Sequence, residues 1–273
     1  MKRITLCADD YAITSSVSQA ILSLADQGAI QATSCMVTMP AWQKQAVNLQ
    51  AYTHKLALGL HLNFTEGAGL TPYFKQGFPS LYSVLVKSHL RLFSQAKLVE
   101  EVNAQIIAFA DATGRLPDFI DGHQHIHHLP QIRQALLSVM QSIDLPKSTT
   151  WIRSVSPLIT PNNSLKHCII EHSGARALRQ LLNETHFKTN AAFAGVYSLS
   201  PHEAFRTLVQ YWLNMLPDKG LIMCHPGFFG KTQKENETIE HEQARQNEYD
   251  YLSSSLFVDD CRSAGVELSA SQL

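Results

Sequence analysis

Short apolar segments alternate with helical segments along the whole chain. The apolar runs are continuous, and turn residues such as Gly28 and Pro40 separate them from the helical patterns. Strands that are apolar throughout are typical of a parallel sheet with both faces covered by helices. The sequence therefore predicts an α/β fold built of βαβ units. The predicted strands are 4–8, 33–39, 56–62, 116–120, 150–155, 193–198, 220–224 and 266–268.

Helical periodicity, caps and breakers define the segments between these strands. A break is expected near Phe93 and Ser94, and another at Gly174. The predicted helices are 17–26, 41–51, 82–111, 130–140, 165–183, 201–216 and 242–264.

Composition limits the classes of protein that fit. The chain has 273 residues and is 45% hydrophobic, which suits one barrel-sized domain over 1–273. Its net charge of −1 gives no reason to expect binding to nucleic acid or to an anionic membrane surface. Five scattered cysteines without CxxC spacing argue against a disulfide framework. No apolar run is long enough for a signal peptide or a membrane span. We therefore expect a cytoplasmic protein.

A histidine-rich run, Asp121-Gly-His-Gln-His-Ile-His-His128, lies between a predicted strand and a helix that begins at Pro130. Neutral imidazole is the commonest metal ligand in proteins. If the run is extended, alternation places His123, His125 and His127 on one side. The run therefore indicates a metal site or a catalytic site. The alternative is a solvated polar loop.

Polar residues also follow several other predicted strands, and the carboxyl ends of barrel strands are where active sites are built. One carboxylate and two imidazoles from different strand ends, Asp10, His61 and His123, could hold a divalent metal and leave a position open for water. The neighbouring Asp9 would then be available as a general base. Taken singly, a paired Asp after a strand is as often a turn or a helix cap, and a single His is more often a buried structural residue. The residues at strand ends are Asp9, Asp10, His61, Asp121, His123 and His225.

Four blocks of sequence carry a resemblance to the YdjC-like carbohydrate deacetylase family: 8–11 (Ala-Asp-Asp-Tyr), 59–63 (Gly-Leu-His-Leu-Asn), 121–127 and 224–227 (Cys-His-Pro-Gly). The resemblance implies a TIM-like, irregular (β/α) barrel. It also implies a metal-dependent hydrolase that removes acetyl groups from N-acetylated sugars, such as chitooligosaccharides or a hopanoid glycolipid. The family's first block usually reads Asn-Ala-Asp-Asp-Phe-Gly, whereas this chain has Cys7, Tyr11 and Ala12.

The resemblance also implies roles by position. Asp10, His61 and His123 match the metal ligands, Asp9 matches the general base, and His225 as an imidazolium would be the general acid. Arg153 is expected to orient Asp9, and His128 to be solvated. The residues expected to support the ligands or contact the sugar are Tyr11, Asp121, His125, His127 and Arg153.

Several points stay open at this level. Two imidazoles and a carboxylate suit zinc, whereas magnesium is the ion commonly ascribed to the family. The long loop 63–82 carries Phe64, Tyr73, Phe74 and Phe78, which could stack on sugar rings or simply pack. A homodimer is the commonest assembly. The competing functions are a metal-dependent phosphoesterase on a similar barrel and a catalytically silent sugar-binding protein.

Overall fold

The computed structural model describes residues 1–161, 165–229 and 241–270. Its strands form one sheet in the order β5-β4-β3-β2-β1-β7-β6, with β8 paired to β1, and every pairing in this sheet is parallel. The α/β prediction is therefore confirmed. The strands are β1 Lys2–Tyr11, β2 Ala32–Cys35, β3 Ala57–Leu62, β4 Phe119–Gly122, β5 Trp151–Ile152, β6 Phe193–Ala194, β7 Gly220–Cys224 and β8 Val266–Leu268.

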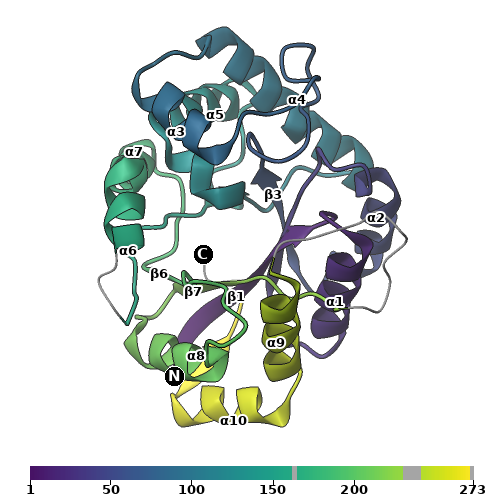
Figure 1. Ribbon diagram of the computed structural model, residues 1–273, viewed down its shortest axis with the longest axis vertical. Coiled ribbons are helices and arrows are strands. Elements are labelled where there is room, and N and C mark those ends of the chain that lie inside the picture. Colours follow the sequence, from purple (N-terminus) through teal and green to yellow (C-terminus); the bar gives the residue numbers. More distant parts are fainter. Residues whose placement is uncertain (162–164, 230–240, 271–273) are drawn as a thin grey trace.

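The sheet curls into an irregular barrel. β1 is the long central strand, and it pairs with β8 near its start, β7 along its middle and β2 toward its end. An isolated parallel bridge between Leu158, after β5, and Phe193, in β6, brings the two ends of the sheet together. Figure 1 shows the helices arranged around the outside of these strands. This is the barrel-like fold that was predicted.

Helices connect the strands and cover the sheet. Local sequence sets their limits: Thr14 caps α1 by accepting the Val17 N–H, Gly114 ends α4 with a φ of 73°, and Pro130 is in the first turn of α5. The α-helices are α1 Ser15–Asp26, α2 Trp42–Leu49, α3 Leu81–His89, α4 Gln95–Thr113, α5 Pro130–Ser142, α6 Leu165–Ile170, α7 Arg176–Thr185, α8 Phe205–Met215, α9 Glu242–Leu252 and α10 Ser255–Ser263.

The predicted boundaries hold with some corrections. The break before Gln95 is present, and a π-helical turn, Glu171–Ala175, separates α6 from α7 at Gly174, whose φ is 138°. The single helix expected over 242–264 is wrong, because the chain turns between α9 and α10. The predicted strands 150–155 and 193–198 are each reduced to two residues, and after β6 the chain leaves the sheet and lines the cavity at Gly195, Val196 and Tyr197.

A large apolar core lies between the sheet and the helices and includes Leu6, Leu58, Ile120 and Trp212. Within the described ranges, no helix is both long enough and apolar enough to cross a bilayer.

Candidate metal centre and its cavity

A cavity of about 920 Å³ opens at the carboxyl ends of the strands. Its wall includes Asp9, Asp10, His61, His123 and His225. These residues come from β1, β3, the segment after β4 and the segment after β7. The convergence expected from strand ends is therefore present in the fold.

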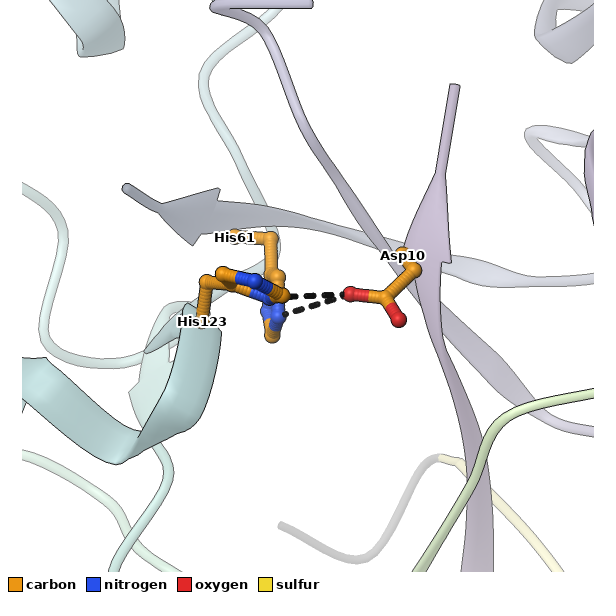
Figure 2. Close-up of side chains that lie close together, drawn as sticks. All are labelled: Asp10, His61 and His123. Atoms are coloured by element: carbon orange, nitrogen blue, oxygen red, sulfur yellow. Dashed lines mark hydrogen bonds and ion pairs between the residues drawn. The ribbon is translucent and has the colours of Figure 1, made fainter. Parts of the chain in front are cut away.

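Asp10, His61 and His123 meet at one carboxylate oxygen, Asp10 Oδ1 (Figure 2). His61 Nε2 lies 3.4 Å from this atom and His123 Nδ1 lies 3.1 Å from it. Asp10 and His61 are almost fully buried, whereas the His123 side chain is 12% exposed. The Asp10–His61–His123 cluster thus joins residues from three separate parts of the chain.

The cluster fits a divalent metal. Ligand atoms bound about 2.1 Å from one tetrahedral ion lie about 3.4 Å apart, which matches both distances to Asp10 Oδ1. The charges of the neighbouring buried side chains also favour a metal ion at the cluster. Asp9, Asp10 and Asp121 are three buried carboxylates, and they pair with two guanidiniums, those of Arg153 and Arg245. This excess of negative groups favours a cation at the cluster.

Burial acts to lower the pKa of His61, but Asp121 and Asp10 outweigh it and raise that pKa to about 10. The proton that this implies would be displaced by a metal bound to Nε2.

A bulge explains how both aspartates reach the cavity. Consecutive residues of a regular strand face opposite ways, so a regular strand would not present both Asp9 and Asp10 to one cavity. The register of β1 against β2 shifts between Ala8 and Tyr11, and Asp10 takes a φ of 69°. Bulges re-aim side chains beside active sites. Tyr11 then points into the core, where its hydroxyl donates to the Gln45 carbonyl at 2.9 Å, and it is not part of the cavity wall.

Asp121 supports the candidate ligand His61. His61 Nδ1 donates to Asp121 Oδ1 at 2.7 Å, which leaves Nε2 facing Asp10. A carboxylate behind a ligating imidazole fixes its tautomer and its orientation. Asp121 is fully buried and absent from the cavity wall, so it acts through His61.

We expect Asp121→Asn to lower zinc affinity by about 10–100-fold, because an amide makes the imidazole a poorer ligand. Isothermal titration with Zn²⁺ measures the change. Asp118→Asn is the matched control, since Asp118 lies just before the same strand and accepts the Leu58 N–H away from the cavity. Equal zinc affinity in the wild type and Asp121→Asn would refute this role.

Arg153 holds Asp9 as predicted. Its guanidinium contacts both Asp9 oxygens at 2.6 Å and also Asp121 Oδ2 at 2.6 Å, and the side chain is fully buried. Burial would raise the pKa of Asp9, but Arg153 keeps it well below the usual range. Asp9 is therefore ionised throughout the physiological range.

The same guanidinium disfavours a metal ion at a second candidate cluster. Cys7, Asp9 and Asp121 also lie close enough together to suggest a metal site. Arg153 Nη2 lies between them, 3.1 Å from Cys7 Sγ and 2.6 Å from Asp9 Oδ1. A cation there would meet a fixed positive charge.

Removing this guanidinium should be costly. Arg153→Met leaves two buried carboxylates without their partner, and we expect a loss of about 3–5 kcal/mol in unfolding free energy. The matched control is Arg3→Met, which breaks the exposed Arg3–Asp218 pair and should cost less than about 1 kcal/mol. Urea unfolding measures both variants. Similar losses for the two would contradict the account of Arg153.

The histidine-rich run is a tight turn, so the alternation expected of an extended segment is wrong. Residues His123–His128 form a short 3₁₀ segment in which Gln124 and His125 have φ values of 52° and 63°. His123 and His125 line the cavity, whereas His127 turns inward and donates from Nε2 to the Arg153 carbonyl at 3.0 Å. His127 therefore supports the segment that carries Arg153.

His128 is also buried, which corrects the expectation that it is solvated. It is 2% exposed, and its Nε2 lies 2.8 Å from Ser173 Oγ. Burial lowers the pKa of His127 to about 4 and lowers the pKa values of His125 and His128 well below the usual range. All three rings are neutral near pH 7.

His225 lines the cavity beside the cluster, but it is not a resting imidazolium. Burial lowers the pKa of His225 to about 4, even though Asp10 acts to raise it. Its Nδ1 is buried and has no hydrogen-bond partner among the described residues. The neutral ring can accept a proton before it donates one.

Two site residues on α9 escaped the sequence reasoning. Arg245 donates to Asp10 Oδ2 at 2.6 Å and holds the pKa of Asp10 well below its usual range against the effect of burial. Glu248 accepts the His225 backbone N–H. Charged residues on a helix are ordinarily solvated, so the sequence gives no signal for either of them.

The aromatic residues of the loop 63–82, which could stack on sugar rings or simply pack, do not reach the cavity. Phe64 and Phe74 are 1% and 3% exposed and pack with Phe78. Tyr73 is exposed but is not part of the wall. Among the described residues that line the cavity, Tyr197, which follows β6, is the one Phe, Tyr or Trp residue.

Fold and site together define an α/β barrel-like protein with a candidate metal centre at the carboxyl ends of its strands. The family model described as YdjC-like protein matches residues 3–263, and the chain belongs to this family. Human carbohydrate deacetylase is 26% identical over 253 residues, covering 83% of this chain and 75% of the relative. The Vibrio vulnificus YJ016 carbohydrate deacetylase is 30% identical over 154 residues, covering 55% of this chain and 60% of the relative.

Solved structures support the fold. A crystal structure of an Enterococcus faecalis V583 protein, with a proposed role in cellobiose-phosphate cleavage, has a TM-score of 0.73 at 20% identity. The match covers 98% of this chain and 97% of that protein. A peptidoglycan N-acetylglucosamine deacetylase, Bc1960, aligns over 99% of this chain and 87% of its own with a TM-score of 0.50 and 10% identity.

Proposed function

We propose that this protein is a metal-dependent hydrolase that removes the acetyl group from an N-acetylated carbohydrate. The observation that carries the proposal is the convergence of Asp10, His61 and His123 on one atom, next to Asp9 and His225, inside a cavity. Membership of the YdjC-like family and relatives named carbohydrate deacetylases support the substrate class.

Asp10, His61 and His123 would hold one divalent ion, and the two imidazoles favour zinc over magnesium. When bound, the ion supplies Lewis acidity, which activates water and stabilises the oxyanion. The carboxylate of Asp10 is fixed from behind by Arg245, and the His61 ring is fixed by Asp121. The protein therefore presents its ligands with little freedom to rearrange.

Asp9 is the proposed general base. It accepts a proton from the attacking water as the water oxygen bonds to the acetamide carbonyl carbon. Arg153 lowers the basicity of Asp9 but keeps it ionised and fixes both of its oxygens. His225 is the proposed general acid. It delivers a proton to the leaving nitrogen as the C–N bond breaks, which yields acetate and a free amine. Because the free ring is neutral, the proton it delivers is the one that Asp9 has taken from the attacking water, which passes to His225 before the C–N bond breaks.

The charges around the cavity suit an uncharged sugar, because Arg153 neutralises Asp9 and Arg245 neutralises Asp10. His125 lines the wall and is placed to contact the sugar. A phosphoesterase with a two-metal centre fits less well, because Arg153 already fills the second cluster.

A screen of acetate release tests the proposal. The protein, loaded in turn with Zn²⁺ and Mg²⁺, is given N-acetylated monosaccharides and oligosaccharides, and phosphorylated sugars serve as the competing set. Metal-dependent acetate release without phosphate release is expected. Phosphate release would favour the phosphoesterase, and tight sugar binding without hydrolysis would favour a silent binding protein.

A further inference from the structure

Helix α9 touches the candidate site at three points. Arg245 reaches Asp10 Oδ2, the Arg245 carbonyl accepts the Gly227 N–H at 3.1 Å, and Glu248 accepts the His225 N–H at 2.5 Å. Figure 1 shows α9 between α8 and α1, and it packs against both helices. One rigid element therefore contacts both a candidate metal ligand and the segment that carries the candidate acid.

Glu248 is the buried carboxylate of this contact. It is 0% exposed, and each of its oxygens accepts one hydrogen bond: Oε1 from the Tyr197 hydroxyl and Oε2 from the His225 backbone N–H, both at 2.5 Å. Tyr197 and His225 both line the cavity, while Glu248 lies behind them. The residue thus ties the segment after β6 to the segment after β7.

Keeping this carboxylate buried is unfavourable. Burial raises the pKa of Glu248 to about 7, although the Tyr197 hydroxyl and the His225 N–H both act to lower it. Buried titratable groups with strongly shifted pKa values cluster at functional sites.

In the part of the chain that the structure describes, no carboxylate accepts a hydrogen bond from the His225 ring. Its Nδ1 is buried without a hydrogen-bond partner among the described residues. The position of the ring therefore depends on its backbone, which leaves β7 at Cys224 and turns at Pro226. Glu248 holds this backbone at the His225 nitrogen itself.

We propose that Glu248 is a positioning residue, which places His225 over the reacting group by holding its backbone N–H and the Tyr197 hydroxyl. The inference rests on the proposed function, because it assumes that His225 delivers the proton. Its effect is on turnover, since the metal ligands and the cavity wall are left in place.

The test compares Glu248→Ala, Glu248→Gln and a control, Asp260→Asn. Asp260 is a suitable control because it accepts a hydrogen bond at 2.9 Å from the hydroxyl of Tyr251, which is on α9, but Asp260 does not line the cavity. We expect Glu248→Ala to lower kcat for acetate release at least tenfold, with KM and zinc affinity changed less than twofold. Glu248→Gln should recover most of kcat, because its Oε1 can accept the His225 N–H and its amide can donate to Tyr197. Asp260→Asn should keep the wild-type kcat.

A second readout requires no turnover. NMR spectra of histidine-labelled protein should show the His225 ring resonances displaced in Glu248→Ala and unchanged in Asp260→Asn. Unchanged kcat and unchanged His225 resonances in Glu248→Ala would overturn the inference. So would a Glu248→Gln variant as impaired as Glu248→Ala. Absence of acetate release by the wild type would instead count against the proposed function, while the resonances would still decide whether Glu248 positions His225.

Discussion

Replacing His123 with alanine should abolish stable zinc binding and lower acetate release by about a thousandfold or more, because Lewis-acid stabilisation is worth several kcal/mol. His123 is the most informative ligand to remove. It comes from a turn and is partly exposed, whereas His61 is held inside the fold by Asp121. The variant should therefore stay folded. Zinc content after dialysis and the rate of acetate release are the two measurements.

The control for this experiment is His54→Ala, because His54 is exposed and does not line the cavity. It should keep both zinc and activity. His128→Ala should also keep the metal, since His128 contacts Ser173 rather than the cluster, although its burial makes a small loss of stability expected. A His123→Ala protein with full zinc and full activity would show that the ligands lie elsewhere.

Asp9→Asn should separate metal binding from catalysis. The amide cannot accept a proton from water, so kcat for acetate release should fall by about 10²–10⁴-fold. Zinc affinity should change little, because Asp9 is not part of the Asp10–His61–His123 cluster. The matched control is Asp218→Asn, which weakens the surface pair with Arg3.

Two results would contradict the assignment of Asp9. Normal deacetylation by Asp9→Asn would mean that another group takes the proton. Loss of zinc together with activity would mean that Asp9 supports the metal rather than the proton transfer. Thermal unfolding must accompany both assays, because Asp9→Asn also leaves the buried Arg153 with one charged partner fewer.

The sequence contains enough information to place most of the site, because the site follows the ends of apolar strands. Asp9, His61 and His225 each directly follow or end such a run, and parallel strands bring those ends to one edge. The same logic predicted the α/β fold, whereas the barrel was implied by the resemblance to the YdjC-like family. The α/β prediction depends on a local pattern, short apolar strands alternating with helices, that survives in the structure.

The other features of the site depend on tertiary contacts, which local sequence patterns do not predict. The bulge that turns Asp10 toward the cavity arises from pairing with β2, and no residue type in the sequence marks it. The turn at Gln124 and His125 changes which histidines face the cavity. Arg245 and Glu248 are charged residues on a late helix, and only tertiary packing reveals that they are buried against Asp10 and His225.

Hydrolytic deacetylation at the Asp10–His61–His123 cluster is tested by following the oxygen of water into the released acetate. Zinc-loaded protein is incubated with an N-acetylated oligosaccharide in ¹⁸O-labelled water, and the masses of the products are measured by mass spectrometry. We predict one acetate for each free amine, with one ¹⁸O atom in each acetate, and no product from His123→Ala. Release of no acetate from any N-acetylated carbohydrate, or equal release by the wild type and His123→Ala, would contradict the account.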